Sequence, residues 1–295
     1  MAAYTTLDLL TAVRARGMFP DASTGSLSAD NLLIYATREL YSKLVPMILA
    51  VREKYYETYT DTALVASQGA YAIPERAIGG VLSSLQYISD LLIYPLEPMD
   101  PVGITTVGTS LTPRGFYFQH NSVVLYPTPE SASGSIRMRY FQRPNALAQT
   151  SACAQVSSFS ALTNEVIVSS IPSTWTTGTV VDFIPGTLPF TPYSQDTSIT
   201  GVTGTTISFT ALPSTIANGD WLSLSQTTPV PEIPVEFQQV LEQMTLVKAL
   251  QGVGDKEGFA IAKGELEDAR SDVIKLITPR DQYGCKKVVS NWRSW

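Results

Sequence analysis

Apolar residues recur at intervals of three and four positions near the C-terminal end of the chain, which is the spacing of one helix face. Six of them fall on a single stripe: Phe259, Ala262, Leu266, Ala269, Val273 and Leu276. A preceding run over residues 237–250 predicts another helix, which Gly252 and Gly254 end. Together the two patterns predict a helical hairpin over residues 232–277, whose stripe must pack on other apolar side chains.

The N-terminal part also carries helical signals. Thr5 and Asp8 match a capping box, which predicts a short helix after them. Ser28 can cap a second helix, and Pro46 should kink or split it because proline has no backbone donor. We therefore expect residues 1–98 to form the N-terminal part of a helical domain.

From about residue 100 the apolar period changes to two, which is typical of strands with one buried face. Residues 115–127 predict two strands joined near His120. In the next predicted strand, residues 135–141, three apolar side chains share one face and Arg137 and Arg139 share the other. These arginines face solvent, a neighbouring subunit or a channel.

Residues 145–230 contain no lysine or arginine and break into short β-branched segments with glycine and proline between them. This punctuation is typical of a sandwich or a barrel. The predicted fold class is α+β: a helical bundle built from N- and C-terminal segments, with an inserted antiparallel β region. The expected divisions are residues 1–98, 99–231 with the β module at about 145–230, 232–277, and an extended arm at 278–295.

Charge is distributed unevenly along the chain. The whole chain has a formal net charge of −6, whereas residues 277–295 hold four basic side chains against one acid, a net charge of +3. This segment has too few apolar residues at any period to fold alone, so it is a frayed end or an arm that orders on a partner. The acidic remainder argues against a protein that grips nucleic acid over its whole surface.

The composition, 44% apolar and 16% charged, is typical of a folded protein. The chain has no run of 18 apolar residues. Its first residues do not combine a basic region with a long apolar segment. We therefore expect a protein made in a cytoplasm, with no membrane partner.

Candidate catalytic chemistry is sparse. His120 is expected at a hairpin tip, with no paired acid or nucleophile motif beside it. The chain lacks a Walker loop, a dinucleotide-binding glycine motif, a zinc-protease motif and a nucleophile elbow. Cys153 and Cys285 have no neighbouring ligand-type residues, so neither a disulfide nor a zinc site follows from them. We expect no enzymatic activity, no metal and no cofactor.

Five residues of the β module leave another interpretation open. Asp182 and Asp220 each lie shortly after a glycine and could act as a catalytic pair or as calcium ligands. Trp175, Tyr193 and Trp221 could form a sugar-binding platform, or pack in a core or between subunits. The alternative is a carbohydrate-binding or hydrolytic β module on a helical stalk.

Several stretches resemble the head-to-tail adaptor proteins of tailed bacteriophages, also called connector or head-completion proteins. Residues 71–82 carry the first likeness, a tyrosine, a hydrophobic residue and proline followed by Glu-Arg-Ala. The others lie at residues 125–129, 136–144, 233–234, 254–255 and 277–280. The resemblance therefore covers most of the chain.

The resemblance implies a structural virion protein that forms a homo-oligomeric ring, usually of twelve copies, at the neck of the virion after assembly in the host cytoplasm. Such a ring would join the portal protein to tail or nozzle proteins and leave a channel for double-stranded DNA, without sequence-specific binding. Another neck or tail ring protein is an alternative within the same class.

The resemblance also assigns roles to particular residues. It makes residues 278–295 a portal-binding arm, with Arg280, Tyr283, Lys286, Lys287, Trp292, Arg293 and Trp295 as its contacts. The helical stripe would pack in the shared core or at the ring contact through Phe259, Leu266, Val273 and Leu276.

Overall fold

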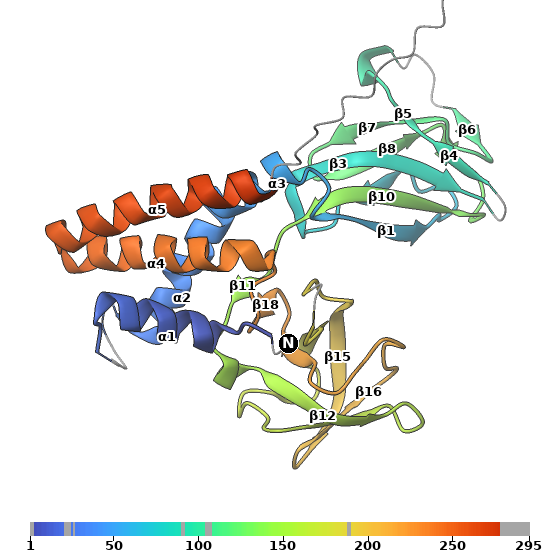
Figure 1. The fold of residues 1–295 in the computed structure, drawn as a ribbon. Helices are drawn as coiled ribbons and strands as arrows, with labels where there is room; N and C mark the ends of the chain where they lie inside the picture. The colour runs from blue at the N-terminus through green and yellow to red at the C-terminus, as the bar shows by residue number, and fades with distance from the viewer. Residues whose placement is uncertain are drawn as a thin grey trace, which may run out of the picture.

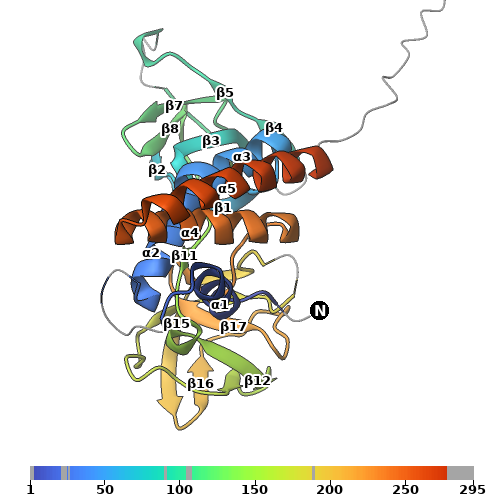
Figure 2. The same ribbon diagram turned by 60° about the vertical axis from the view of Figure 1, so that its left-hand side comes forward.

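Segments from the two ends of the chain form one helical layer in the computed structural model (Figures 1 and 2). The structure describes residues 3–20, 25, 27–89, 92–103, 108–187 and 190–277. The helices of the layer are α1 (Thr6–Gly17), α2 (Ala29–Glu39), α3 (Val45–Val51), α4 (Gln238–Val253) and α5 (Lys256–Ile277). The predicted α+β class, with a helical bundle made from both chain ends and an antiparallel β region between them, is confirmed.

Helix α4 lies at the centre of this layer. Ten of its 16 residues are buried, and α1, α2 and α5 all pack against it. Leu9 of α1, Leu32 of α2 and Leu266 of α5 belong to one buried cluster with Met244 of α4. A helix that is surrounded on all sides can only be stable inside a core. The two ends of the chain are therefore held together by a single apolar core.

Local sequence signals explain how the N-terminal helices begin and bend. The backbone N–H of Thr5 donates to the Asp8 carboxylate at 2.8 Å, and the Thr5 hydroxyl accepts from the Asp8 backbone, so the predicted capping box is confirmed. Before Pro46 the chain forms a π-helical turn, Leu40–Leu44, and α3 follows it directly. The widened turn accommodates the proline that cannot donate to the helical ladder.

Two four-stranded sheets form a sandwich on one side of the helical layer (Figure 1). Their strand orders are β1-β10-β3-β4 and β2-β8-β7-β5. Tyr71, Leu85, Leu125 and Met138 come from both sheets and share one buried core. The strands of this lobe are β1 (Glu57–Ala63), β2 (Ala70–Ala72), β3 (Ala77–Ile88), β4 (Ile93–Pro95), β5 (Glu97–Pro98), β6 (Thr109–Ser110), β7 (Gly115–Gln119), β8 (Ser122–Tyr126), β9 (Thr128–Pro129) and β10 (Ser135–Gln142).

The expectation of a helical segment that continues to residue 98 is wrong beyond Val51. Strand β1 begins at Glu57 and pairs with β10 along its full length. Its threonines favour extended backbone, but this preference is weak without a partner. The partner strand lies far along the chain, so pairing at long range decides this segment. The hairpin at His120 and the outward placement of Arg137 and Arg139 follow local patterns and are confirmed.

The predicted β module is a closed barrel on the other side of the helical layer (Figure 2). Its core includes Val166, Phe183, Ile207 and Leu222. Closure joins the first strand to the last, so the barrel has no free sheet edge. In barrel order the strands are β12 (Ala154–Ser160), β13 (Glu165–Val168), β16 (Thr206–Phe209), β15 (Ser194–Thr203), β14 (Val180–Ile184) and β17 (Trp221–Leu224).

The chain enters and leaves the barrel side by side. Strands β11 (Ala146–Leu147) and β18 (Thr227–Thr228) pair in parallel at its base. The backbone N–H of Thr6 donates to Pro229 and the Thr6 hydroxyl donates to the Ala148 carbonyl, both at 2.7 Å. The start of α1 is therefore hydrogen-bonded to the residue that follows each of the two strands.

The stripe on α5 packs mainly on the protein's own core. Leu266 is 5% exposed, and Phe259 and Val273 lie partly buried against the same cluster. Leu276 is 70% exposed. Three of the four predicted packing residues thus contact the core of this chain, while a ring contact stays a prediction that fits Leu276 best.

Replacing Leu266 with alanine should lower the free energy of unfolding by about 2–5 kcal/mol, because it opens a cavity in a closed core. Leu276→Ala removes the same atoms from an exposed position of the same helix and should change the stability of the isolated chain by less than about 0.5 kcal/mol. Denaturant titrations followed by far-ultraviolet circular dichroism compare the two variants. Equal losses would show that α5 is not packed as described.

Candidate functional site

One buried ion pair connects the sandwich to the barrel. Arg76 lies in the turn between β2 and β3, and its guanidinium donates two parallel hydrogen bonds to Asp182 on β14, at 2.8 and 2.9 Å. Arg76 is 6% exposed and Asp182 is fully buried. Paired parallel bonds of this kind fix geometry as well as charge. The pair therefore sets the position of one β lobe relative to the other.

Further partners surround this pair. Asp182 also accepts hydrogen bonds from the Asn145 side chain at 2.9 Å and from the backbone N–H groups of Asp196 and Gln226 at 2.9 and 3.0 Å. Arg76 donates to the Asp196 carboxylate at 2.8 Å. Burial acts to lower the pKa of Arg76, but its bonds to Asp182 and Asp196 outweigh this effect and raise the pKa above its ordinary value. We call Arg76, Asn145, Asp182 and Asp196 the Arg76 network.

Four of the five residues considered for hydrolysis or sugar binding have structural partners instead: Asp182, Asp220, Tyr193 and Trp175. Asp182 is saturated within the Arg76 network. Asp220 accepts from the backbone of Gly186 and Ala217 and from the Tyr193 hydroxyl, at 2.8–2.9 Å. Trp175 is 4% exposed and lies in the barrel core. The two acids therefore hold loops of the barrel in place, and Trp175 is not available as a surface platform.

The candidate histidine and the described cysteine also occupy structural positions. His120 occupies the hairpin tip with a positive φ of 54°, as expected for a turn residue. Burial raises the pKa of the Cys153 thiol to about 11, which keeps it protonated; Cys285 lies outside the described residues. No group of three or more metal-ligating side chains occurs within the described part of the chain. None of the helices described is long and apolar enough to cross a bilayer.

The two outward arginines of β10 are held on their own sheet. Arg137 donates to both carboxylate oxygens of Asp61 on β1, at 2.8 and 2.7 Å. The hydrogen bond from Arg137 lowers the pKa of Asp61. Both Arg137 and Arg139 lie over the Tyr59 ring, at 4.1 and 5.5 Å from its centre. Both arginines are therefore held against strand β1, Arg137 by Asp61 and the Tyr59 ring and Arg139 by the same ring.

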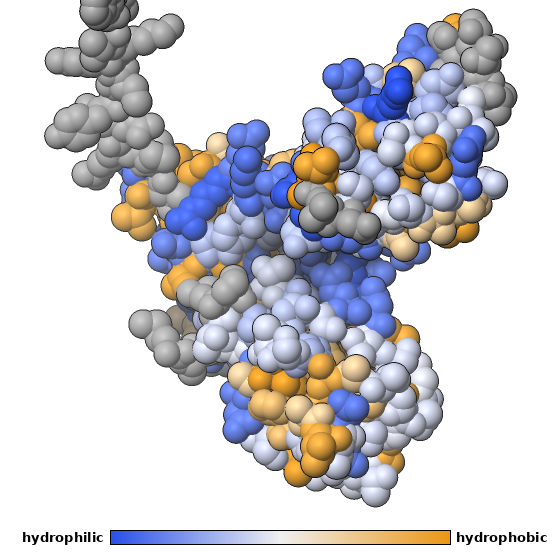
Figure 3. All heavy atoms as spheres, turned by 90° about the vertical axis from the view of Figure 1, so that its right-hand side faces the viewer, coloured by the Kyte–Doolittle hydropathy of each residue, from blue (hydrophilic) through white to orange (hydrophobic). Residues whose placement is uncertain are grey.

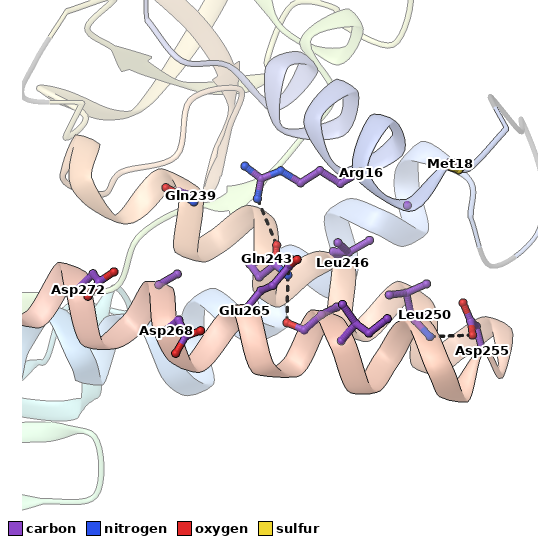
Figure 4. Close-up of a pocket in the computed structure, with 15 residues that line it drawn as sticks. Arg16, Met18, Gln239, Gln243, Leu246, Leu250, Asp255, Glu265, Asp268 and Asp272 are labelled. Atoms are coloured by element: carbon purple, nitrogen blue, oxygen red, sulfur yellow. Dashed lines mark hydrogen bonds between the residues drawn. The ribbon is translucent and has the colours of Figure 1, made fainter.

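A groove with acidic walls runs between α1, α4 and α5 (Figure 4). Its volume is about 740 Å³, and Leu246, Leu250 and Ala262 provide apolar lining. Gln243 crosses it, because it accepts from Arg16 of α1 at 3.2 Å and donates to Glu265 of α5 at 2.9 Å. The acids that line the groove are Asp255, Glu265, Asp268 and Asp272. Sequence reasoning missed this groove because α1 and α5 meet only in the fold.

Both β lobes expose apolar side chains at their surfaces. Figure 3 shows hydrophilic side chains at the waist between the lobes and apolar side chains gathered on the barrel. Phe159, Leu162 and Ile167 of the barrel are exposed by 40%, 95% and 44%. The barrel therefore presents apolar side chains that its own core does not use.

The seven predicted contacts of the arm lie outside the described residues. The structure therefore does not test them: Arg280, Tyr283, Lys286, Lys287, Trp292, Arg293 and Trp295. The described chain ends at Ile277, the last residue of α5.

The family comparison agrees with a bacteriophage adaptor. The sequence model of the family described as SU10 adaptor protein matches residues 4–182, more than half of the chain. The protein is thus a phage head-to-tail adaptor, a structural class found at the virion neck. Specifically, the chain belongs to the SU10 adaptor protein family. No curated protein shows significant similarity to it.

The matched range contains both ends of the interlobe ion pair. It covers α1 to α3, the sandwich and the first three barrel strands in sequence as far as Asp182. Arg76 also belongs to the stretch that carries the sequence resemblance. An arginine in the turn motif is therefore a contact to the barrel, a role that the motif alone does not reveal.

Removing one member of the ion pair should strongly destabilise the fold. Arg76→Leu leaves the buried Asp182 carboxylate without a counter-charge and should cost about 3–5 kcal/mol in the free energy of unfolding. Asp182→Asn leaves Arg76 paired with Asp196 alone and should cost less. The double variant should lose less than the sum of the two. Arg137→Leu is the matched control, because its pair with Asp61 is exposed to solvent and should have a much smaller effect. Denaturant titration followed by tryptophan fluorescence measures these differences, and additive losses would contradict the pairing.

Glu232 adds a pH-sensitive group beside the Arg76 network. Its side chain is 3% exposed, and one carboxyl oxygen accepts from the Asn145 backbone at 3.3 Å. Burial raises the pKa of Glu232 to about 8, from an ordinary value of 4.5. The folded protein thus holds a proton that the unfolded chain releases between these two values. This contribution to stability is complete below pH 4.5 and is lost by about pH 8.

Glu232→Gln keeps the side chain neutral and should therefore melt at a higher temperature than the wild type at about pH 8. The difference should shrink as the pH falls towards about 4, where the carboxyl is mostly protonated in the unfolded chain as well. Differential scanning calorimetry across this range measures it. Glu236→Gln, at an exposed position nearby, is the control and should show no such trend. A constant difference at all pH values would rule out a buried proton at Glu232.

Proposed function

We propose that the chain forms an oligomeric head-to-tail adaptor ring that docks on the portal, joins it to the tail and leaves a channel for DNA. The observation that carries this proposal is the family match over residues 4–182. The sequence resemblance favours twelve copies. Portal protein and tail or nozzle proteins are its proposed partners.

The proposal of a ring is supported by apolar side chains of the helical layer that remain exposed in the single chain. Ile34, Ile261 and Leu276 are exposed by 45%, 60% and 70%, on α2 and α5. A ring needs two different patches on each subunit that fit each other around the circle. Helices at opposite ends of the sequence offer such separate patches, and Leu276 is our first candidate for the contact between subunits.

The charge of the chain suits a conduit for DNA. Residues 1–276 carry 16 basic and 25 acidic side chains, a net charge of −9. Phosphate binding needs clustered lysine and arginine, whose counterion release drives affinity. In the described part Arg76 and Arg137 are already paired with acids. Such a body lets DNA pass without holding it.

Residues 278–295 are the proposed portal-binding arm. Arg280, Lys286, Lys287 and Arg293 supply positive charge, and Tyr283, Trp292 and Trp295 supply aromatic anchors. Aromatic side chains that enter pockets commonly dominate the energy of an interface. A segment that orders on its partner can also wrap a large surface.

Deletion of residues 278–295 should abolish binding to purified portal while the far-ultraviolet circular dichroism stays that of a folded protein. Trp292→Ala combined with Trp295→Ala keeps every charge and should weaken binding at least about tenfold. Co-sedimentation with portal particles measures both. Intact docking after the deletion would show that the arm is not the portal contact.

The position of the chain in assembled particles separates the two ring hypotheses. Electron cryomicroscopy of virions should show it directly on the portal, with twelve copies in the ring. A position at the far end of the tail would instead identify another neck or tail ring protein.

A further inference from the structure

The groove between α1, α4 and α5 has the form of a docking site for an extended chain. It is about 740 Å³ in volume and opens along α5. Ile261 of α5 and Met18, just after α1, provide apolar contact surface at 60% and 93% exposed, above a floor formed by the buried Leu246 and Leu250 of α4. An apolar surface bordered by charges suits a peptide that carries both apolar and charged side chains.

The walls of the groove hold acids that are not neutralised. Within the described ranges no cation forms an ion pair with Asp255, Glu265 or Asp268, and Asp272 meets only Lys275, at 3.5 Å. Arg16 is the one basic residue in the lining, and it is paired with Glu242 at 3.1 Å. The lining residues therefore have a formal net charge of −3. The groove is suited to a basic occupant.

The geometry points to this chain's own segment 278–295 as that occupant. The segment carries a net charge of +3, equal and opposite to that of the groove. Tyr283, Trp292 and Trp295 supply the aromatic groups that the apolar lining would cover. Charge and apolar character thus match along the same stretch of chain.

Length permits this contact within one molecule. The acids of the groove run from Asp255, just before α5, to Asp272 within it, which at 1.5 Å per residue is about 26 Å. The segment follows Ile277, the last residue of α5, and 18 extended residues can span about 60 Å. Thr278 and Pro279 favour a turn, so the segment can reverse along the helix. A short tether also gives an effective concentration in the millimolar range.

The consequence is a covered arm in the free subunit. Its basic and aromatic residues are occupied in the groove until a competing surface displaces them. This inference does not depend on the portal, because it concerns the isolated chain.

Chymotryptic cleavage after Tyr283 in the full-length protein tests the contact in the absence of any portal. The variant Asp268→Lys with Asp272→Lys should be cleaved about tenfold faster than the wild type, because two favourable charge contacts become repulsive. Glu257→Lys with Glu267→Lys makes the same charge change on the same helix outside the groove and should be cleaved at the wild-type rate. Raising the salt to about 0.5 M should speed cleavage of the wild type more than that of the groove variant.

Each outcome decides the proposal. Equal cleavage of all three proteins would overturn it, as would equal acceleration by both pairs of substitutions. Protection that increases with protein concentration, together with dimers in light scattering, would assign the groove to the segment of a second copy and overturn contact within one chain. Normal portal binding by the groove variant would leave the proposed function intact, so the two proposals fail separately.

Discussion

The arrangement of this adaptor depends on burying a charge between its two β lobes. Arg76 and Asp182 come from a turn of the sandwich and a strand of the barrel, and each is almost inaccessible to water. Removing two charges from water is costly unless their remaining bonds are also satisfied. Asn145 and the backbone of Asp196 and Gln226 meet that requirement. The loops that carry these partners must therefore be in place before the pair is stable, which couples folding of the barrel base to folding of the sandwich.

The fold could be predicted from the sequence wherever local spacing decides the structure. The capping box at Thr5, the stripe on α5 and the hairpin at His120 all depend on residues within a few positions of one another. The strand at Glu57–Ala63 was not predicted, because its partner strand β10 is distant in the chain and threonine-rich segments have only a weak preference for the strand conformation. Closure of the barrel, as opposed to an open sandwich, is also a long-range property that short β-branched strands do not reveal.

The candidate sites also divide into features that local sequence predicts and features that depend on long-range contacts. The charge contrast of residues 278–295 is visible in composition alone, whereas the acidic groove needs α1 to meet a hairpin more than 200 residues away. The sequence left a catalytic role open for Asp182, because nothing near it in the chain indicates an ion-pair partner. The partner, Arg76, lies 106 residues earlier, in a motif that the resemblance had already singled out. Sequence reasoning found both residues but had no means of joining them.

The paired strands at the base of the barrel have a consequence for how such a chain can change. Because Ala146 lies beside Thr227 in a parallel pair, a short link that steps sideways from the first strand into the second would replace the barrel and keep the direction of the chain. A shortened relative of this kind would keep the sandwich and the helical layer, but it would lack the counter-ion of Arg76. Loss of the barrel and replacement of that arginine by a neutral side chain would therefore have to occur together. The chain topology permits loss of the barrel, whereas the buried charge of Arg76 opposes it.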